Sequence, residues 1–182
     1  MKKGGFKLAA FGTSMPAVFK TETICVKRAY SAVERVVDIG GSLRKKTVNI
    51  SHDGEKQFQY LMMEVSCLVW AQALLDMVYD YIRETDDFRN LPFNIPHFWF
   101  VMAAIAIEQS SLAFVKKTFL LEEVIDTDAE GPFWKYLNNV LSEPLAMDTK
   151  KDEERANFLA FSQHVQYWKT KKQVFVSDYQ GK

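Results

Sequence analysis

The chain has 182 residues, of which 48% are hydrophobic and 14% are aromatic. This length and composition predict one globular domain with a sizeable core and exclude an intrinsically disordered chain. The 23 basic and 23 acidic side chains give a formal net charge of zero, so no overall field attracts nucleic acid or an anionic membrane. A local basic cluster, Arg44-Lys45-Lys46, is expected to be solvated surface.

The cysteines and the apolar runs predict where the protein works. Cys25 and Cys67 each lie within an apolar run and are expected to be small buried hydrophobes, not a disulfide. A reducing, cytoplasmic location follows as the default. The longest apolar run, 98–107, is too short to span a bilayer, and no signal segment is recognisable. We therefore expect no membrane partner.

The first 28 residues read as strands and turns. Strand-like runs at 6–11, 17–20 and 22–28 surround a break that begins at Gly12, which predicts two strands joined by a glycine-containing turn. Lys27 ends an apolar run, so its ammonium group is expected to emerge at the edge of the sheet, although an ordinary strand-end lysine would read the same way.

The next segment is mixed, and then the clearest helical signal begins. Residues 30–51 predict a short helical or irregular piece at 32–38 and a strand at 47–50. Residues 53–84 carry apolar side chains at helical spacing, with Asp53 as a candidate N-cap. Glu64 interrupts the apolar run 61–70, and the run alone predicts a solvent-facing glutamate.

The second half predicts a loop, a hairpin and another helix. Residues 85–96 form the loop, and 98–107 and 118–125 form neighbouring strands, the first buried on both faces. A helix across 98–113 is the competing interpretation, because alanines in this stretch favour it. Residues 149–168 predict a helix with Thr149 and Asp152 in a capping box.

The chain ends on a stretch with chemical groups at a strand exit. Residues 172–177 predict a buried strand that delivers Asp178 and Gln180 to its carboxyl end. Without other evidence this is an ordinary strand-to-turn exit. The three histidines have no metal-ligand spacing, and a packed or surface role is expected for them.

Several blocks in this order carry a resemblance to a known family. They resemble the alpha-type (atypical) protein kinases, the family of the myosin heavy chain kinases, the elongation factor kinase and the channel-kinases, and they look most like its fungal branch. The blocks are Gly4-Gly5-Phe6-Lys7, Ile24-Cys25-Val26-Lys27-Arg28, Leu120-Leu121-Glu122-Glu123, Phe133-Trp134-Lys135-Tyr136, Asn138-Asn139, Phe161-Ser162 and Asp178-Tyr179-Gln180-Gly181.

The resemblance implies a fold and an activity. The fold would be an α+β, two-lobed atypical kinase, with a first lobe at 1–121, a connection at 122–126 and the start of a second lobe at 127–182. The activity would be ATP-dependent phosphorylation of serine or threonine in a protein substrate with Mg²⁺. ATP and a protein substrate are the implied partners.

The resemblance also implies roles for single residues. Phosphates would be held by Gly4, Gly5, Lys7 and Lys27, with Glu64 paired to Lys27 as in other kinase-like lobes. The adenine would be held by Glu122, Glu123, Val124 and Ile125, and the sugar and phosphates by Lys135 and Asn138. Asp178 would accept or orient the substrate hydroxyl's proton, and Gln180 would coordinate Mg²⁺.

The sequence departs from the family pattern in ways that predict weak catalysis. The turn 126–131 is longer, Leu137 replaces an asparagine and Gln163 replaces a histidine. The family's second metal aspartate, glycine-rich substrate loop and zinc module have no counterpart, and Cys25 and Cys67 cannot supply the zinc set. We expect a C-terminally incomplete member that is a poor catalyst. The alternatives are a catalytically impaired nucleotide-binding or interaction domain, or a purely structural α+β domain.

Overall fold

The computed structural model describes residues 2–3, 7–40, 42–85, 95–109, 117–125, 133–140 and 143–181. Within these residues, antiparallel strands and two helices give a mixed α+β chain, which confirms the predicted class at that level. The chain divides into two compact units: unit 1 comprises 1–68 and 101–124, and unit 2 comprises 69–100 and 125–182.

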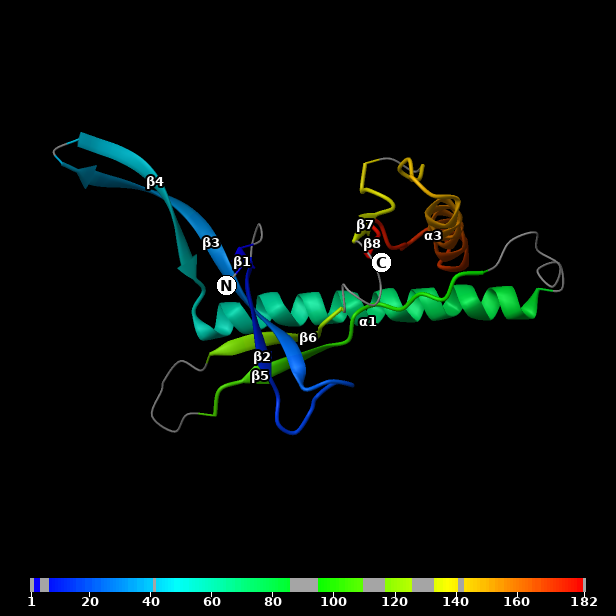
Figure 1. Cartoon of the computed structure of the whole chain (residues 1–182), viewed down its shortest axis with the longest axis horizontal. Coiled ribbons are helices and arrows are strands. Elements are labelled where there is room, and N and C mark those ends of the chain that lie inside the picture. Colours follow the sequence, from blue (N-terminus) through cyan, green and yellow to red (C-terminus); the bar gives the residue numbers. More distant parts are fainter. Residues whose placement is uncertain are drawn as a thin grey trace. The chain divides into compact units, whose positions relative to one another are not determined.

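Unit 1 is built on one antiparallel sheet (Figure 1). The strand order is β1-β2-β3-β6-β5, with β4 paired to the far part of β3. The strands are β1 (Lys2–Lys3), β2 (Lys7–Thr13), β3 (Thr23–Ile39), β4 (Ser42–Ser51), β5 (Ala103–Ile107) and β6 (Thr118–Glu123). The sheet places β2, β3 and β6 side by side, and these strands carry Lys7, Lys27, Glu122 and Glu123 of the predicted site.

The connection from β2 to β3 differs from the prediction. Gly12 lies inside β2 opposite Ile24, not in the turn, and residues 17–20 form no strand. The chain reverses where the Ser14 amide donates to the Glu22 carbonyl at 2.9 Å. Residues 17–20 lie within this reversal, where no neighbouring strand pairs with them.

The prediction of a helical or irregular piece at 32–38 is wrong, because β3 runs on to Ile39 and pairs residue by residue with β4. Its β-branched residues Val33, Val36 and Val37 favour an extended backbone. Gly40 adopts a φ of 63° at the turn, a conformation that glycine reaches without strain. The two strands form a hairpin, here called the arm, that extends beyond the sheet of unit 1 (Figure 1).

The long helix is confirmed as α1 (Gly54–Glu84). The Asp53 carboxylate accepts from the Lys56 amide at 2.9 Å, so the predicted cap is also confirmed. In unit 1 the helix packs Leu61 against Ala29 of β3 and Leu120 of β6, with Val65 at the margin. The first part of α1 therefore covers one face of the sheet.

Helix α1 is apolar over a longer stretch than the run 98–107 that the sequence analysis compared with a bilayer. Among the described residues it is the one helix long and apolar enough to cross a membrane, with a mean hydropathy of 1.5 over 18 residues, of which 28% are buried. Core helices of soluble proteins share this composition, and Leu61, Leu75 and Val78 of α1 lie in packed cores. The run 98–107 was therefore the wrong segment to compare with a bilayer.

The predicted hairpin of β5 and β6 is confirmed, with Ala103 opposite Glu122 and Ile107 opposite Thr118. Strand β5 is shorter than predicted and its side chains are half-buried or exposed, so burial on both faces is wrong. Residues 98–109 contain no helix, which excludes that alternative for the described part. Most of the predicted loop, 86–94, lies outside the described residues.

Unit 2 is organised around α3 (Lys150–Lys169) and the later part of α1. Thr149 caps α3 and Asp152 lies in its first turn, which confirms the predicted start. A two-stranded ladder joins β7 (Trp134–Lys135) to β8 (Gln180–Gly181). The core of this unit contains Leu75, Val78, Ile82, Tyr136, Leu137, Ala156, Phe158, Leu159, Val165 and Tyr179.

The predicted buried strand at 172–177 is wrong. Lys171 and Lys172 have positive φ, and Val174 and Phe175 are exposed. Two side chains of α3 anchor the segment instead: Gln163 Nε2 donates to the Val176 carbonyl, and Gln166 Oε1 accepts from the Val176 amide, both at 2.8 Å. No described strand lies beside residues 172–177 to pair with them. The strand-like sequence pattern of this segment therefore does not produce a strand.

The cysteines are both free, and only one resembles the prediction. Cys25 is partly buried in β3, whereas Cys67 is exposed on α1. Burial raises the pKa of the Cys25 thiol. This keeps the thiol in its neutral form at physiological pH.

Candidate functional site

Two lysines lie on one face of the unit 1 sheet. Lys27 of β3 stands opposite Ala9, and Lys7 of β2 stands opposite Ala29. Because side chains alternate along a strand, both lysines and Ala29 share a face, and Ala29 packs against Leu61 of α1. The lysines therefore lie on the face that α1 covers, as diagonal neighbours on adjoining strands.

Each lysine has a carboxylate partner, but not the predicted one. Lys7 Nζ donates to Glu64 of α1, and Lys27 Nζ donates to Glu122 of β6. The predicted pairing of Glu64 with Lys27 is therefore wrong. Sheet register explains the difference: Glu122 stands opposite Cys25, which makes it the diagonal neighbour of Lys27.

The two ion pairs differ in burial. The side chains of Lys7 and Glu64 are 28% and 31% exposed, whereas those of Lys27 and Glu122 are 24% and 9% exposed. Both lysine side chains remain partly open to solvent. The arrangement places two cations on adjoining strands of the sheet, each beside a carboxylate that offsets its charge.

The segment after β6 is held by Glu123. Its carboxylate accepts from the Met102 amide at 2.9 Å, and its amide donates to the Met102 carbonyl at 3.0 Å. Val124 and Ile125 follow without regular structure and are half-buried. Glu123 thus fixes the backbone that leads to the two residues predicted to face the adenine.

Unit 2 brings together three of the residues predicted from the resemblance. Lys135 of β7 lies opposite Gln180 of β8, and Lys135 Nζ lies 2.8 Å from Asp178 Oδ1. Tyr179 between them is buried, and its carbonyl accepts from the Tyr136 amide at 2.9 Å. Asp178 has a φ of 61°, and its side chain is 43% exposed. This solvent-accessible cluster is called the Asp178 cluster below.

Gln166 supports the Asp178 cluster and was missed by the sequence analysis. It is fully buried, donates to the Tyr179 hydroxyl at 3.1 Å and accepts from the Val176 amide. Burial raises the pKa of Tyr179 to about 12. The available signal was a glutamine seven residues after Leu159, on the apolar side of a predicted helix.

The other predicted residues are not in these clusters as far as the structure describes them. Asn138 Oδ1 accepts from the Val140 amide at 2.9 Å, which closes a local turn. Gly4 and Gly5 lie outside the described residues.

The metal prediction rests on few protein ligands. The described residues contain no group of three or more His, Cys, Asp or Glu side chains that could hold a metal ion. Mg²⁺ commonly takes one or two protein oxygens and completes its shell with phosphates and water. The side-chain amide oxygen of Gln180, the predicted metal ligand, is on an exposed residue and fits that mode.

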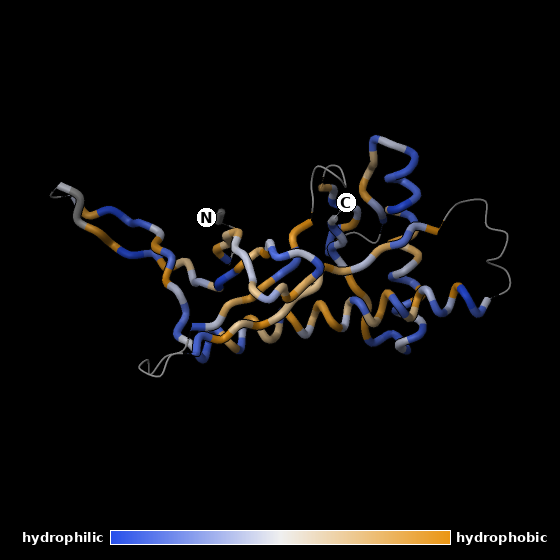
Figure 2. Tube along the Cα trace, turned by 60° about the horizontal axis from the view of Figure 1, so that its bottom comes forward, coloured by the Kyte–Doolittle hydropathy of each residue, from blue (hydrophilic) through white to orange (hydrophobic). Residues whose placement is uncertain are grey.

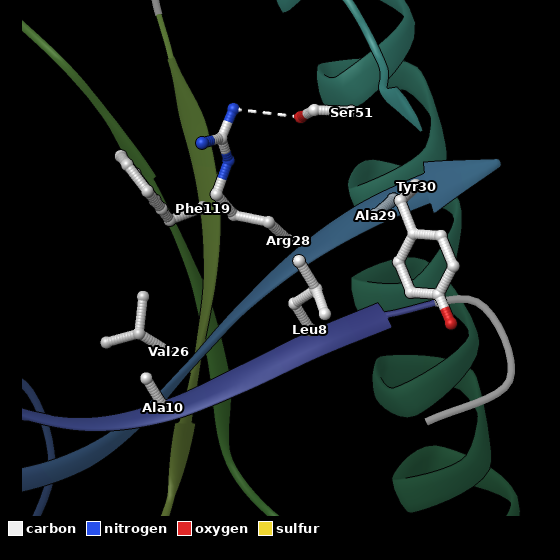
Figure 3. A pocket seen from close by; sticks show the side chains of 8 residues that line it. All are labelled: Leu8, Ala10, Val26, Arg28, Ala29, Tyr30, Ser51 and Phe119. Atoms are coloured by element: carbon white, nitrogen blue, oxygen red, sulfur yellow. Dashed lines mark hydrogen bonds between the residues drawn. The ribbon is translucent and has the colours of Figure 1, made fainter. Parts of the chain in front are cut away.

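The opposite face of the unit 1 sheet is hollowed by an apolar pocket of about 160 Å³. Figure 3 shows its lining, in which Arg28 Nη2 donates to Ser51 Oγ at 3.0 Å. The Arg28 guanidinium carbon lies 5.4 Å from the centre of the Phe119 ring. The lysines predicted to hold phosphate, Lys7 and Lys27, lie on the other face of the sheet, so this pocket is not the predicted phosphate site. It is lined by Leu8, Ala10, Val26, Arg28, Ala29, Tyr30, Ser51 and Phe119.

Comparisons with protein-family models, with curated proteins and with solved structures found no match.

Proposed function

We propose that the protein is an ATP-dependent serine/threonine protein kinase of the alpha type. The observation that carries the proposal is the placement of Lys7 and Lys27 on one face of an antiparallel sheet, partly open to solvent and each beside a carboxylate. Kinases hold the α- and β-phosphates with a strand lysine that an acidic residue orients. Glu122 takes that orienting role for Lys27 in this proposal.

Each unit has its own task in this reaction. In unit 1, Lys7 and Lys27 hold phosphates, and the backbone after Glu123 faces the adenine. In unit 2, Asp178 accepts the proton of the substrate hydroxyl, and Gln180 offers an oxygen to Mg²⁺. Mg²⁺, when bound with ATP, offsets the charge of the phosphates.

The transfer itself needs little covalent chemistry from the protein. The hydroxyl oxygen of serine or threonine forms a bond to the γ-phosphorus, the bond from that phosphorus to the ADP oxygen breaks, and the hydroxyl proton passes to the Asp178 carboxylate. Lys135, 2.8 Å from Asp178, holds that carboxylate in position. The phosphoprotein and ADP are the products.

Nucleotide binding is tested by thermal unfolding with and without excess Mg-ATP. At about 100 times Kd, a ligand stabilises the native state by roughly 2.7 kcal/mol, which raises Tm by several degrees. The informative variant is Lys27→Met combined with Glu122→Gln, because removing Lys27 alone would leave a buried carboxylate unpaired. We expect the double variant to fold and to lose the shift.

A matched control uses Lys45→Met, which removes an equally charged but exposed lysine of the arm. It is expected to keep the shift. If the Lys27→Met/Glu122→Gln variant keeps the Tm shift, the phosphates bind elsewhere. If neither the native chain nor either variant shows a Tm shift although all three fold, nucleotide binding is rejected.

Catalysis is tested separately with labelled ATP and a serine-rich protein such as casein. Asp178→Asn keeps the size of the side chain and removes its basicity, so the Tm shift is expected to persist while label transfer is lost. A Tm shift without any transfer by the native chain would favour the alternative, a catalytically impaired nucleotide-binding domain.

A further inference from the structure

The arm of unit 1 is a two-stranded ribbon with little cover. Ten residue pairs join β3 to β4, from Tyr30 opposite Ser51 to Ile39 opposite Ser42. Val36 and Leu43 are 62% and 75% exposed, and within the described chain neither β4 nor the part of β3 from Tyr30 to Ile39 pairs with a third strand. Two-stranded ribbons are marginally stable alone in water, so this arm is suited to gaining a partner.

The two faces of the arm carry different charges. Because opposed residues of an antiparallel pair share a face, the register places Arg35, Lys46 and Arg44 together, with no acidic residue on that face. We call this the basic face. Both acids of the arm, Glu34 and Asp38, lie at register positions on the other face, where Glu34 is 3.6 Å from Lys45.

The cations of the basic face have no carboxylate partner among the side chains that the structure describes. Arg35 stands directly opposite Lys46, a like-charged pair that destabilises a ribbon. Arg35, Arg44 and Lys46 form no ion pair within the described chain. An unpaired set of three cations on an uncovered ribbon points to an anionic partner.

The apolar residues and the free strand edge favour a polypeptide partner. By register, Val33, Val48 and Val37 alternate with the cations on the basic face. Figure 2 shows hydrophilic and hydrophobic stretches following one another along the arm. The phosphates of a nucleic acid are contacted by polar and basic side chains, which leaves these valines without a role. Elements that bind membrane surfaces have their apolar and basic residues on opposite faces, whereas the basic face of the arm carries both. A second arm is also disfavoured, since it would bring like charges together.

We propose that the arm binds an extended acidic segment of a partner protein by adding it as a strand along the free edge of β4. Every second residue of β4 directs its amide and carbonyl away from β3, and these groups pair with the added backbone. The carboxylates of the segment then meet Arg44 and Lys46, while its alternate side chains pack near Val36 and Leu43. This inference does not depend on nucleotide binding.

The test uses the full chain and a fluorescein-labelled peptide of alternating Glu and Val, about 12 residues long, followed by anisotropy. Lys46→Glu, on the basic face, is expected to weaken binding about 10-fold or more, equivalent to at least about 1.4 kcal/mol. Lys45→Glu makes the same charge change one residue away on the other face and is expected to change Kd by less than about 3-fold. Circular dichroism checks that both variants fold.

Two further probes separate strand addition from simple charge attraction. A peptide of alternating Glu and Pro keeps the charge but lacks half of the amides, so its binding is expected to be lost. Equal weakening by Lys45→Glu and Lys46→Glu, or equal binding of the proline peptide, would overturn the proposal. The proposal would also be overturned if the Glu-Val peptide did not bind. It would be overturned likewise if a DNA duplex or phosphatidylserine vesicles bound more tightly than this peptide and their binding depended on Lys46.

Discussion

At the scale of single residues, Glu122 is the most buried charged residue in the described part of unit 1. Its side chain is 9% exposed and its ion-pair partner is Lys27. A buried carboxylate that loses its cation has a desolvation cost that nothing offsets. Lys27 therefore stabilises the folded state by pairing with Glu122, whatever ligand it binds. Replacing Lys27 tests the stability of the protein as well as its function.

The first prediction follows from this pair. Lys27→Met is expected to lower the free energy of unfolding by about 3–5 kcal/mol, whereas Lys27→Met combined with Glu122→Gln is expected to recover most of that loss. Urea unfolding of the two single variants and the double variant measures the coupling. The exposed pair of Glu34 and Lys45 serves as the control, and Lys45→Met should leave stability nearly unchanged. A negligible coupling between Lys27 and Glu122 would contradict the pair's role.

Tyr179 gives a prediction about alkaline pH. Burial raises its pKa from 10.0 to about 12, so the folded state holds the phenol neutral where the unfolded chain ionises. Its contribution to stability is complete below about pH 10 and is lost as the pH rises through 10 to 12. At pH 11 the native chain should have lost about 1.4 kcal/mol that a Tyr179→Phe variant does not lose.

The comparison with Tyr179→Phe isolates this group from all others that titrate. At neutral pH the variant is expected to be about 1 kcal/mol less stable, because Gln166 loses its acceptor. Urea unfolding from about pH 8 to pH 11 should therefore show the difference closing. A constant difference over this range would mean that Tyr179 titrates normally in the folded protein.

At the scale of elements, the start of α3 gives a local test. Thr149 Oγ1 accepts from the Asp152 amide at 3.1 Å and donates to the Asp152 carboxylate at 2.7 Å. Thr149→Ala is expected to cost about 1 kcal/mol of stability, and Thr149→Ser much less, because serine keeps the hydroxyl. Urea unfolding measures both, and equal losses would show that the methyl group matters more than the cap.

The same elements show what the sequence could predict. Helices α1 and α3 were predicted with their caps, because apolar spacing and capping side chains are local signals. The strand predicted at 172–177 failed, because a strand needs a partner that the local pattern does not reveal. The helical piece predicted at 32–38 failed for the related reason that pairing with β4 decides its structure.

In the candidate site, too, the sequence predicted some residues correctly and missed those whose role depends on how the chain pairs in space. Lys135, Asp178 and Gln180 were singled out by resemblance, and the β7–β8 ladder brings them together. The partner of Lys27 was predicted wrongly, because the choice between Glu64 and Glu122 depends on sheet register. Gln166 was missed because its importance comes from Val176 and Tyr179, which contact it only after the chain folds back.

At the scale of the whole molecule, one helix serves two cores. Helix α1 gives Leu61 to the core of unit 1 and Leu75, Val78 and Ile82 to the core of unit 2. A continuous helix that belongs to both units should make their unfolding cooperative. All four tryptophans lie in unit 2, so their fluorescence reports on that unit alone.

Leu61→Ala tests this coupling from unit 1. Leu61 is fully buried, so the cavity is expected to cost about 2–5 kcal/mol. If α1 couples the units, the urea midpoint seen by tryptophan fluorescence in unit 2 should fall together with the midpoint seen by thiol labelling of Cys25 in unit 1, in a Cys67→Ser background. Met63→Ala, on the same helix but with Met63 70% exposed, should leave both midpoints in place. A Leu61→Ala variant whose Cys25 becomes reactive while the tryptophan midpoint stays unchanged would show that the units unfold independently, because the helix then frays in one unit without disturbing the other.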